Sequence, residues 1–180
     1  NSEQLGERKR GGRAMKTLYH GSYITVSAPL AKAGRRNLNF GQGFYLTQIM
    51  EQAQEWAVII AGRKGRNVTP VVNSYTFDDV SAKEDGVRFK ILDSYDIEWL
   101  DFIVSSRNGE KPWQEYDLIE GGIANDHVID TIEAYMNGYM TIEMALGQLA
   151  RHRPNNQICL LNQNLIDDCL FFKNVELLTT

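Results

Sequence analysis

Two short glycine-containing segments constrain the fold of this chain most strongly. The first is His20-Gly21-Ser22, at the end of a run with strand character, and the second is residues 40–45, Phe-Gly-Gln-Gly-Phe-Tyr. Glycine has no Cβ, so the backbone at Gly21 can approach another group closely. The paired glycines of the second segment suit a tight turn that enters a strand and presents Tyr45 to a pocket. Together the segments predict a cleft for a flat, cationic ring, with the N–H and C=O of Gly21 binding a carboxamide.

The length of the chain fits one domain. Of its 180 residues, 43% are hydrophobic. A chain of this size buries about 70% of the surface that it exposes when unfolded, so one core suffices. Residues 1–14 are charged and lack a hydrophobic period, which is typical of a disordered extension or an expression remnant, with a basic arm for nucleic acid as the alternative. We therefore expect a single domain over residues 15–180.

Charge, hydropathy and cysteine content argue against several classes of protein. The formal net charge of -4 and the pI of about 5.4 do not favour general attraction to nucleic acid or to anionic membranes. No apolar run approaches the roughly 18 residues of a membrane span, so we expect a cytoplasmic protein. Cys159 and Cys169 lack metal-site spacing and the density of a disulfide scaffold, which predicts two buried thiols. The isolated His20, His127 and His152 predict no bound metal.

Hydrophobic periodicity predicts an α+β fold, because early strands, middle helices and late strands follow one another along the chain. Besides the two glycine-containing segments, strands are expected at residues 69–77, 87–92, 116–120, 156–161 and 170–177, with a brief turn between the last two. Helices are expected at residues 49–62, 95–107, 127–136 and 142–152.

Short polar side chains before the later helices predict their N-caps. Asp93 or Ser94 is expected to cap the helix at 95–107, Asp126 the helix at 127–136, and Thr141 the helix at 142–152.

Other nucleotide-binding and hydrolase motifs do not fit the sequence. The Gly41-Gln42-Gly43 tripeptide lacks the third glycine of a dinucleotide-binding fingerprint, where Leu46 stands, and no βαβ unit follows it. The chain contains neither a P-loop nor a Gly-x-Ser-x-Gly elbow. A Rossmann-type dehydrogenase and a serine hydrolase are therefore not expected.

The segments at 20–22 and 40–45 resemble the NAD-binding half of the ADP-ribosyltransferase superfamily, in its diphtheria-toxin-like and poly-ADP-ribose-polymerase-like branch with a His-Tyr-Glu triad. The resemblance implies an α+β fold with a split antiparallel β-sheet core and flanking helices. From Met15 onward, the chain is also similar to the bacterial family called domain of unknown function 3990. That family shares the first two strands, a Gly-x-x-Ala-Asn-Asp segment matched at residues 121–126, and a strand matched at Gln157.

The resemblance implies a role for the first strand in holding NAD. His20 is expected to bind the adenosine ribose, while the backbone of Gly21, with Ser22, holds the carboxamide of nicotinamide. A structural role at the end of a strand is the alternative for His20.

Three later residues would complete the site. The resemblance implies that Tyr45 and Trp56 sandwich the pyridinium ring, and that Gln157, where the family has glutamate, binds a ribose hydroxyl. Each has a structural alternative: Tyr45 as a core residue, Trp56 packed on the core side of its apolar helix, and Gln157 as the end of a turn.

We therefore interpret the chain as an NAD-dependent mono-ADP-ribosyltransferase that needs no metal, a bacterial toxin or effector acting in the cytoplasm or delivered into a target cell. Its expected partners are a macromolecular acceptor, protein or nucleic acid, and an antitoxin or regulatory protein. Two alternatives stay open, an NAD glycohydrolase and a non-catalytic pseudoenzyme that binds NAD or a partner. The neutral amide of Gln157 favours the pseudoenzyme.

Overall fold

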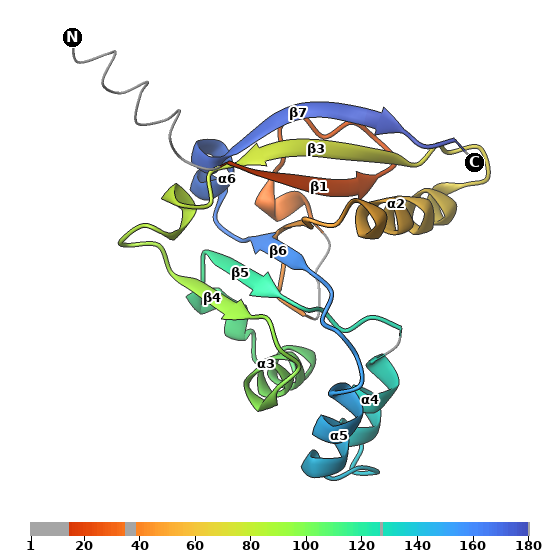
Figure 1. The fold of residues 1–180 in the computed structure, drawn as a ribbon, viewed down its shortest axis with the longest axis vertical. Coiled ribbons are helices and arrows are strands. Elements are labelled where there is room, and N and C mark those ends of the chain that lie inside the picture. Colours follow the sequence, from red (N-terminus) through yellow and green to blue (C-terminus); the bar gives the residue numbers. More distant parts are fainter. Residues whose placement is uncertain (1–14, 35–38, 127, 180) are drawn as a thin grey trace. The chain divides into compact units, whose positions relative to one another are not determined.

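The structure is a computed structural model that describes residues 15–34, 39–126 and 128–179 (Figure 1). The predictions for residues 1–14 and for His127 therefore lie outside the described residues. The chain divides into two compact units that interleave along the sequence, and whether they form one domain stays a prediction. The first unit comprises Asn1–Pro29, Leu46–Val87 and Gln163–Thr180, and the second comprises Leu30–Tyr45 and Arg88–Asn162.

The first unit is built on an antiparallel sheet with the strand order β1-β3-β7 (Figure 1). Its strands are β1 (Lys16–Ser22), β3 (Val71–Phe77) and β7 (Leu170–Leu177). Its helices are α2 (Met50–Lys64), the 3-10 turn η2 (Ser81–Lys83) and α6 (Gln163–Cys169). The pairing of β3 with β7 shifts register between Ser74 and Tyr75.

Helix α2 packs closely on one face of this sheet because its buried side chains are small. Ala53, Ala57 and Ala61 recur every fourth residue, which places them on one face of the helix, and all three are buried. The helix ends at Gly65, whose N–H donates to the carbonyl of Ala61 at 3.2 Å. The predicted helix at 49–62 is confirmed.

The second unit contains a mixed sheet with the strand order β2-β6-β5-β4. Its strands are β2 (Phe44–Leu46), whose last residue already belongs to the first unit, β4 (Phe89–Leu92), β5 (Leu118–Gly121) and β6 (Gln157–Leu160). β5 and β6 are antiparallel, whereas β4 and β5 are parallel. The expectation of antiparallel pairing throughout is therefore wrong for β4 and β5. The segment that joins these two strands contains a helix, and such a crossover makes parallel pairing possible.

Helices surround the core of the second unit. They are η1 (Ala31–Ala33), α3 (Ile97–Arg107), η3 (Pro112–Glu115), α4 (Ile129–Met136) and α5 (Ile142–Leu149). The core is formed by apolar side chains from α3, α4, α5 and the sheet, and its largest fully buried members are Trp99, Phe40, Leu100, Ile103, Ile119, Ile132 and Leu149. The α+β class is confirmed.

Two of the three predicted N-caps are wrong. Asp96 caps α3, accepting from the N–H of Trp99 at 3.0 Å, because its own backbone is extended and the helix begins at Ile97. α4 begins after Val128, so Asp126 lies too early to cap it. Thr141 caps α5 as predicted, with its Oγ1 accepting from the N–H of Met144 at 3.2 Å.

Helix α6 stands where the sequence predicted a brief turn between the last two strands. Leu165, Ile166 and Cys169 of this helix are buried, and the burial of this short apolar face stabilises a helix that is too short to form alone. Cys159 and Cys169 are both buried thiols, as predicted. Burial raises the pKa of Cys169 to about 11 and also raises the pKa of Cys159.

In the part of the chain that the structure describes, every helix is too short or too polar to cross a lipid bilayer.

Candidate functional site

The open edge of β1 carries the backbone groups of Gly21. Tyr19 exchanges two hydrogen bonds with Thr47, with its N–H donating to the Thr47 carbonyl at 2.8 Å and its carbonyl accepting from the Thr47 N–H at 3.0 Å. Backbone groups in an antiparallel strand alternate between its two edges, so Gly21 directs its N–H and C=O to the same edge as Tyr19. Among the described residues, neither group of Gly21 has a hydrogen-bond partner there. This glycine is buried, and leaving its N–H and C=O without hydrogen bonds costs free energy, so a ligand that binds both groups would stabilise them.

The missing side chain of Gly21 makes room for α2. A Cβ at this position would lie 2.2 Å from the carbonyl oxygen of Ala53 and 2.7 Å from the nitrogen of Ala57. The close approach predicted for the Gly21 backbone is therefore an approach to a helix, and any ligand must bind Gly21 along the strand edge. The glycine and the small helix residues thus fit together as one packing unit.

Trp56 lies on α2 between Ala53 and Ala57 in the sequence, but its side chain is 42% exposed. The prediction that it faces the core is wrong, since successive residues are about 100° apart around a helix and the alanine stripe takes the buried face. The guanidinium carbon of Arg63 lies 5.7 Å from the centre of the Trp56 ring. An accessible aromatic ring with an affinity for cations therefore flanks the helix that covers Gly21.

His20 points to the opposite face of the sheet from α2. Tyr19 packs against the cluster of Ala53, Ala57 and Val72, and Gly21 faces the backbone of α2, so alternation along the strand turns His20 and Ser22 away from this helix. His20 lies opposite Asn73 of β3 and is half-buried. Ser22 is buried, and its Oγ is 3.4 Å from the N–H of Ile24. Within the first unit, His20 therefore faces away from α2, the helix that carries Trp56.

Tyr45, in the second unit, uses its hydroxyl to close the glycine turn that precedes it. Its Oη donates to the carbonyl of Gly41 at 2.7 Å and accepts from the N–H of Phe40 at 3.3 Å. Burial raises the pKa of Tyr45, and the neighbouring Cys159 raises it further, so the phenol remains a donor at neutral pH. The ring itself is half-buried against the core of the unit.

The two glycines of this turn are required by packing. Gly41 has a φ of 88°, and a Cβ there would lie 2.3 Å from the ring of Trp113. A Cβ on Gly43 would lie 2.6 Å from the Sγ of Cys159. The Gly-x-Gly pattern thus serves a left-handed turn and a tight contact with β6.

Gln157 heads the apolar strand β6, as the sequence predicted. It lies opposite Gly121 of β5 and is half-buried. The residues of the predicted site therefore belong to both units. The first unit contains His20, Gly21, Ser22 and Trp56, and the second contains Tyr45 and Gln157.

Sequence reasoning missed a pair of polar residues on β3 that bind the chain just after β1. Asn73 is 0% exposed, and its amide binds the backbone of residues 24–26, as does the hydroxyl of Tyr75. One sign was present in the sequence, because asparagine is depleted in strands and stands here within a predicted strand at 69–77.

The second unit holds residues 122–124 in a similar way, through side chains from several elements. Two side chains donate to carbonyls of this segment, Trp99 Nε1 to Gly122 at 2.6 Å and Tyr95 Oη to Ile123 at 3.2 Å. Two amide oxygens accept from its backbone N–H groups, Asn155 Oδ1 from Ile123 at 2.7 Å and Asn39 Oδ1 from Ala124 at 3.1 Å. This segment lies within the Gly-x-x-Ala-Asn-Asp match of the sequence, and it directly follows the strand residue opposite Gln157. The matched residues 121–126 therefore include a stretch of backbone, 122–124, that side chains from other parts of the unit hold by hydrogen bonds.

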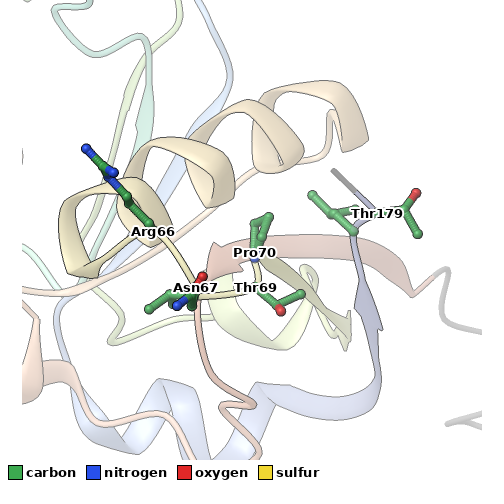
Figure 2. A pocket seen from close by; sticks show the side chains of 7 residues that line it. Arg66, Asn67, Thr69, Pro70 and Thr179 are labelled. Atoms are coloured by element: carbon green, nitrogen blue, oxygen red, sulfur yellow. The ribbon is translucent and has the colours of Figure 1, made fainter.

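A polar pocket lies elsewhere in the first unit (Figure 2). It is lined by the segment between α2 and β3 and by the end of the chain after β7, with Arg66, Asn67, Thr69, Pro70 and Thr179 among its residues. None of the predicted site residues lines this pocket.

A family model described as "Protein of unknown function (DUF3990)" matches residues 16–172. The chain belongs to this family. The likeness seen in the sequence from Met15 onward is thereby confirmed for the family itself. No curated protein and no solved structure matches the chain.

Proposed function

We propose that the protein is an NAD-dependent mono-ADP-ribosyltransferase. The observation that carries the proposal is the backbone pair of Gly21, a buried donor and acceptor on the open edge of β1. A carboxamide offers one acceptor and one donor, so it can bind both groups of Gly21 as an added strand residue would. Trp56 supplies an exposed aromatic face on the helix that covers this glycine.

The proposed reaction breaks the bond between nicotinamide and ribose. The bonding electrons move to the ring nitrogen, which neutralises the pyridinium, and the sugar develops the charge of an oxocarbenium ion. An acceptor nucleophile then attacks the sugar carbon and loses a proton. The protein must hold the leaving ring and stabilise the charged sugar, and binding that strengthens in the transition state accelerates the reaction. An aromatic ring stacked on the pyridinium favours the cationic form by about 0.5 to 2 kcal/mol and so contributes to NAD binding.

The motifs that resemble the His-Tyr-Glu branch support the assignment of roles to His20, Tyr45 and Gln157. The proposal includes a core like that of the ADP-ribosyltransferases, and the division of the strands into two sheets supports it. A macromolecule is the proposed acceptor, with the protein acting as a bacterial toxin or effector under the control of an antitoxin or regulatory protein.

Gln157 favours single transfers over polymer growth. An amide can orient a ribose hydroxyl, but it has no pKa at which it can accept a proton. Activation of an ADP-ribose hydroxyl for chain elongation needs such a base. The same neutral amide favours the two alternatives, hydrolysis of NAD and binding without chemistry, which the product analysis separates.

The test is incubation of the purified protein with labelled NAD and a cell extract. Label in protein or nucleic acid supports transfer, whereas free ADP-ribose alone identifies a glycohydrolase. Absence of both products, with NAD binding measured by calorimetry, identifies a pseudoenzyme. Absence of NAD binding contradicts both enzymatic readings and leaves only the pseudoenzyme that binds a partner.

Two substitutions place the ligand. Trp56→Ala and Tyr45→Ala should each weaken NAD binding by about 3- to 30-fold, the range expected for one aromatic–cation contact. Tyr139→Ala is the matched control, because Tyr139 is 83% exposed and lies between α4 and α5. Equal affinity in the parent and in a folded Trp56→Ala variant would remove Trp56 from the site.

A further inference from the structure

The chain that leaves β1 is irregular but firmly held. Residues 24–26 form no helix or strand, and Ile24 is 52% exposed. Their backbone nevertheless makes three side-chain hydrogen bonds to β3. The Val26 N–H donates to Asn73 Oδ1 at 2.9 Å, Asn73 Nδ2 donates to the Ile24 carbonyl at 3.1 Å, and Tyr75 Oη donates to the Val26 carbonyl at 2.5 Å.

Asn73 and Tyr75 are both fully buried. Burying an amide and a phenol without partners is costly, so these side chains are stable in the core only while residues 24–26 stay in place. Burial raises the pKa of Tyr75, which keeps its hydroxyl a donor at physiological pH. The asparagine amide binds an N–H and a C=O two residues apart, as a neighbouring strand would.

The bound segment crosses the same face of the sheet that carries His20. Asn73 and His20 lie opposite each other in the antiparallel pairing of β1 with β3, and directly paired residues project from the same face. Asn73 reaches residues 24–26 from this face. The segment therefore borders the side chain of His20, away from α2.

We infer that Asn73 and Tyr75 are positioning residues that hold residues 24–26 as a wall beside His20, and that this wall sets the affinity for NAD. This inference rests on the proposed function, in which His20 binds the adenosine ribose. In that proposal the wall lies beside the adenosine ribose of NAD, away from the bond between nicotinamide and ribose that breaks. Loss of the wall should therefore raise KM for NAD and leave kcat close to the parental value.

The experiment compares Asn73→Ser and Tyr75→Phe with the parent by steady-state nicotinamide release and by amide hydrogen exchange. Asn73→Ser removes both amide contacts and should raise KM about tenfold. A tenfold change corresponds to the binding free energy contributed by about one buried hydrogen bond. Tyr75→Phe keeps the ring and its edge contact with Phe172, whose centre lies 5.8 Å away, and should raise KM about threefold. In both variants kcat should stay within about twofold of the parent.

Amide exchange reports on the wall without any ligand. Exchange at Val26 should become at least about tenfold faster in Asn73→Ser, while the amides of β3 keep their protection. Tyr95→Phe is the matched control, because it removes one buried phenol that donates to a backbone carbonyl in the second unit. This control should leave both Val26 exchange and the KM for NAD unchanged.

The outcomes test separately whether Asn73 holds residues 24–26 and whether these residues contribute to NAD binding. Unchanged exchange of the Val26 amide in Asn73→Ser overturns the inference that Asn73 holds the wall, whatever the kinetics show. Faster exchange with an unchanged KM, or with an equal fall in kcat, overturns its role in NAD binding. If the parent neither binds NAD nor releases nicotinamide, the proposed function fails and the wall loses its assigned ligand. The exchange result then still decides whether Asn73 holds residues 24–26.

Discussion

The two units fix an irregular segment of backbone in different ways. In the first unit, neighbouring residues of the single strand β3 hold residues 24–26. In the second unit, residues 122–124 are held from α3, from the approach to β6 and from the segment before β2. A segment tied to one strand depends on that strand alone, whereas a segment tied to three elements loses only part of its support when one contact is removed. The first unit is therefore the more sensitive of the two to single substitutions at its polar contacts.

The units also differ in how they hold a partly buried carboxylate. Asp79 of the first unit lies between two ammonium groups, 3.2 Å from Lys16 Nζ and 2.9 Å from Lys83 Nζ. Asp117 of the second unit accepts from the N–H of Arg88 at 2.9 Å, and its other oxygen lies 3.2 Å from both the Arg88 guanidinium and the Asn162 amide. Flexible lysines bind by charge, while backbone and amide donors bind by fixed geometry. The difference predicts that salt weakens the contacts of Asp79 more than those of Asp117.

The largest effect is expected where a glycine meets the backbone of another element in each unit. A Cβ at Gly21 would lie 2.2 Å from the Ala53 carbonyl, and a Cβ at Gly121 would lie 2.1 Å from the Leu92 carbonyl. Backbone cannot move aside as a flexible side chain can, so Gly21→Ala and Gly121→Ala should each lower the free energy of unfolding by about 3 kcal/mol. Urea unfolding followed by tryptophan fluorescence measures both.

The controls for this pair are Gly62→Ala in α2 and Gly147→Ala in α5. Apart from the adjacent residues and the backbone of the same helix, no atom of the described residues lies within 4 Å of a Cβ at either position. Alanine is the better helix former, so both controls should stabilise the protein by about 0.5 to 1 kcal/mol. A Gly21→Ala variant as stable as Gly62→Ala would contradict the packing of α2 on β1.

The next effect concerns catalysis, for which Gln157 of the second unit is the residue to test. Gln157→Glu restores a carboxylate and should raise the rate of nicotinamide release by about 10- to 100-fold, because a charged hydrogen bond is stronger than a neutral one by about 1 to 2 kcal/mol. Gln157→Ala should lower the rate. Gln114→Glu, which adds the same charge at an exposed site in η3, is the control. Equal rates in Gln157→Ala and the parent would remove Gln157 from the site.

The sequence predicted best what depends on short-range pattern. The existence of helix α2, the Thr141 cap and the position of Gln157 at the head of β6 follow from residues close in the chain. No pattern in the sequence indicates α6, because a helix of seven residues depends on burial in the folded protein. Parallel pairing of β4 with β5 was missed for the same reason, since strand partners are chosen by tertiary contacts.

In the candidate site, too, short-range motifs were visible in the sequence, whereas features that depend on tertiary contacts were not. The motif containing Gly21 is visible in the sequence, but the reason for this glycine is the backbone of α2, which local pattern cannot reveal. Trp56 looked like a core residue because tryptophan is apolar, and the narrow alanine stripe beside it decided its exposure. The asparagine within a predicted strand, Asn73, was a visible sign, but its partners, 47 and 49 residues away, could not be identified from the sequence.

A smaller effect tests the two carboxylates. Burial alone would raise their pKa values, but the donors around Asp79 and Asp117 outweigh it and hold both pKa values below the ordinary range. A carboxyl group with a depressed pKa in the folded state contributes stability above its unfolded pKa of about 4, and this contribution is lost as pH falls through the folded value. At neutral pH, Asp117→Asn should cost about 2 kcal/mol and Asp79→Asn about 1 kcal/mol.

Salt separates the two carboxylates. Raising the salt concentration to 1 M should shrink the cost of Asp79→Asn by about half, because the ammonium partners are partly exposed and screened. The cost of Asp117→Asn should hardly change. Equal salt dependence of the two variants, measured by urea unfolding at pH 7, would contradict the proposed difference between charge and fixed geometry.

The smallest effect concerns how the main helix of each unit begins. In the second unit, Asp96 caps α3 by accepting from the N–H of Trp99 at 3.0 Å. In the first unit, α2 begins after Ile49, whose side chain is apolar and 42% exposed. Asp96→Ala should therefore lower the free energy of unfolding by about 1 kcal/mol, whereas Ile49→Ala should change it by less than about 0.5 kcal/mol. Thermal unfolding of the two variants checks the difference, and Asp96→Asn should retain most of the parental stability because an amide oxygen can accept the same bond. A loss in Asp96→Asn as large as that in Asp96→Ala would show that the charge near the helix N-terminus, rather than the hydrogen bond, stabilises α3.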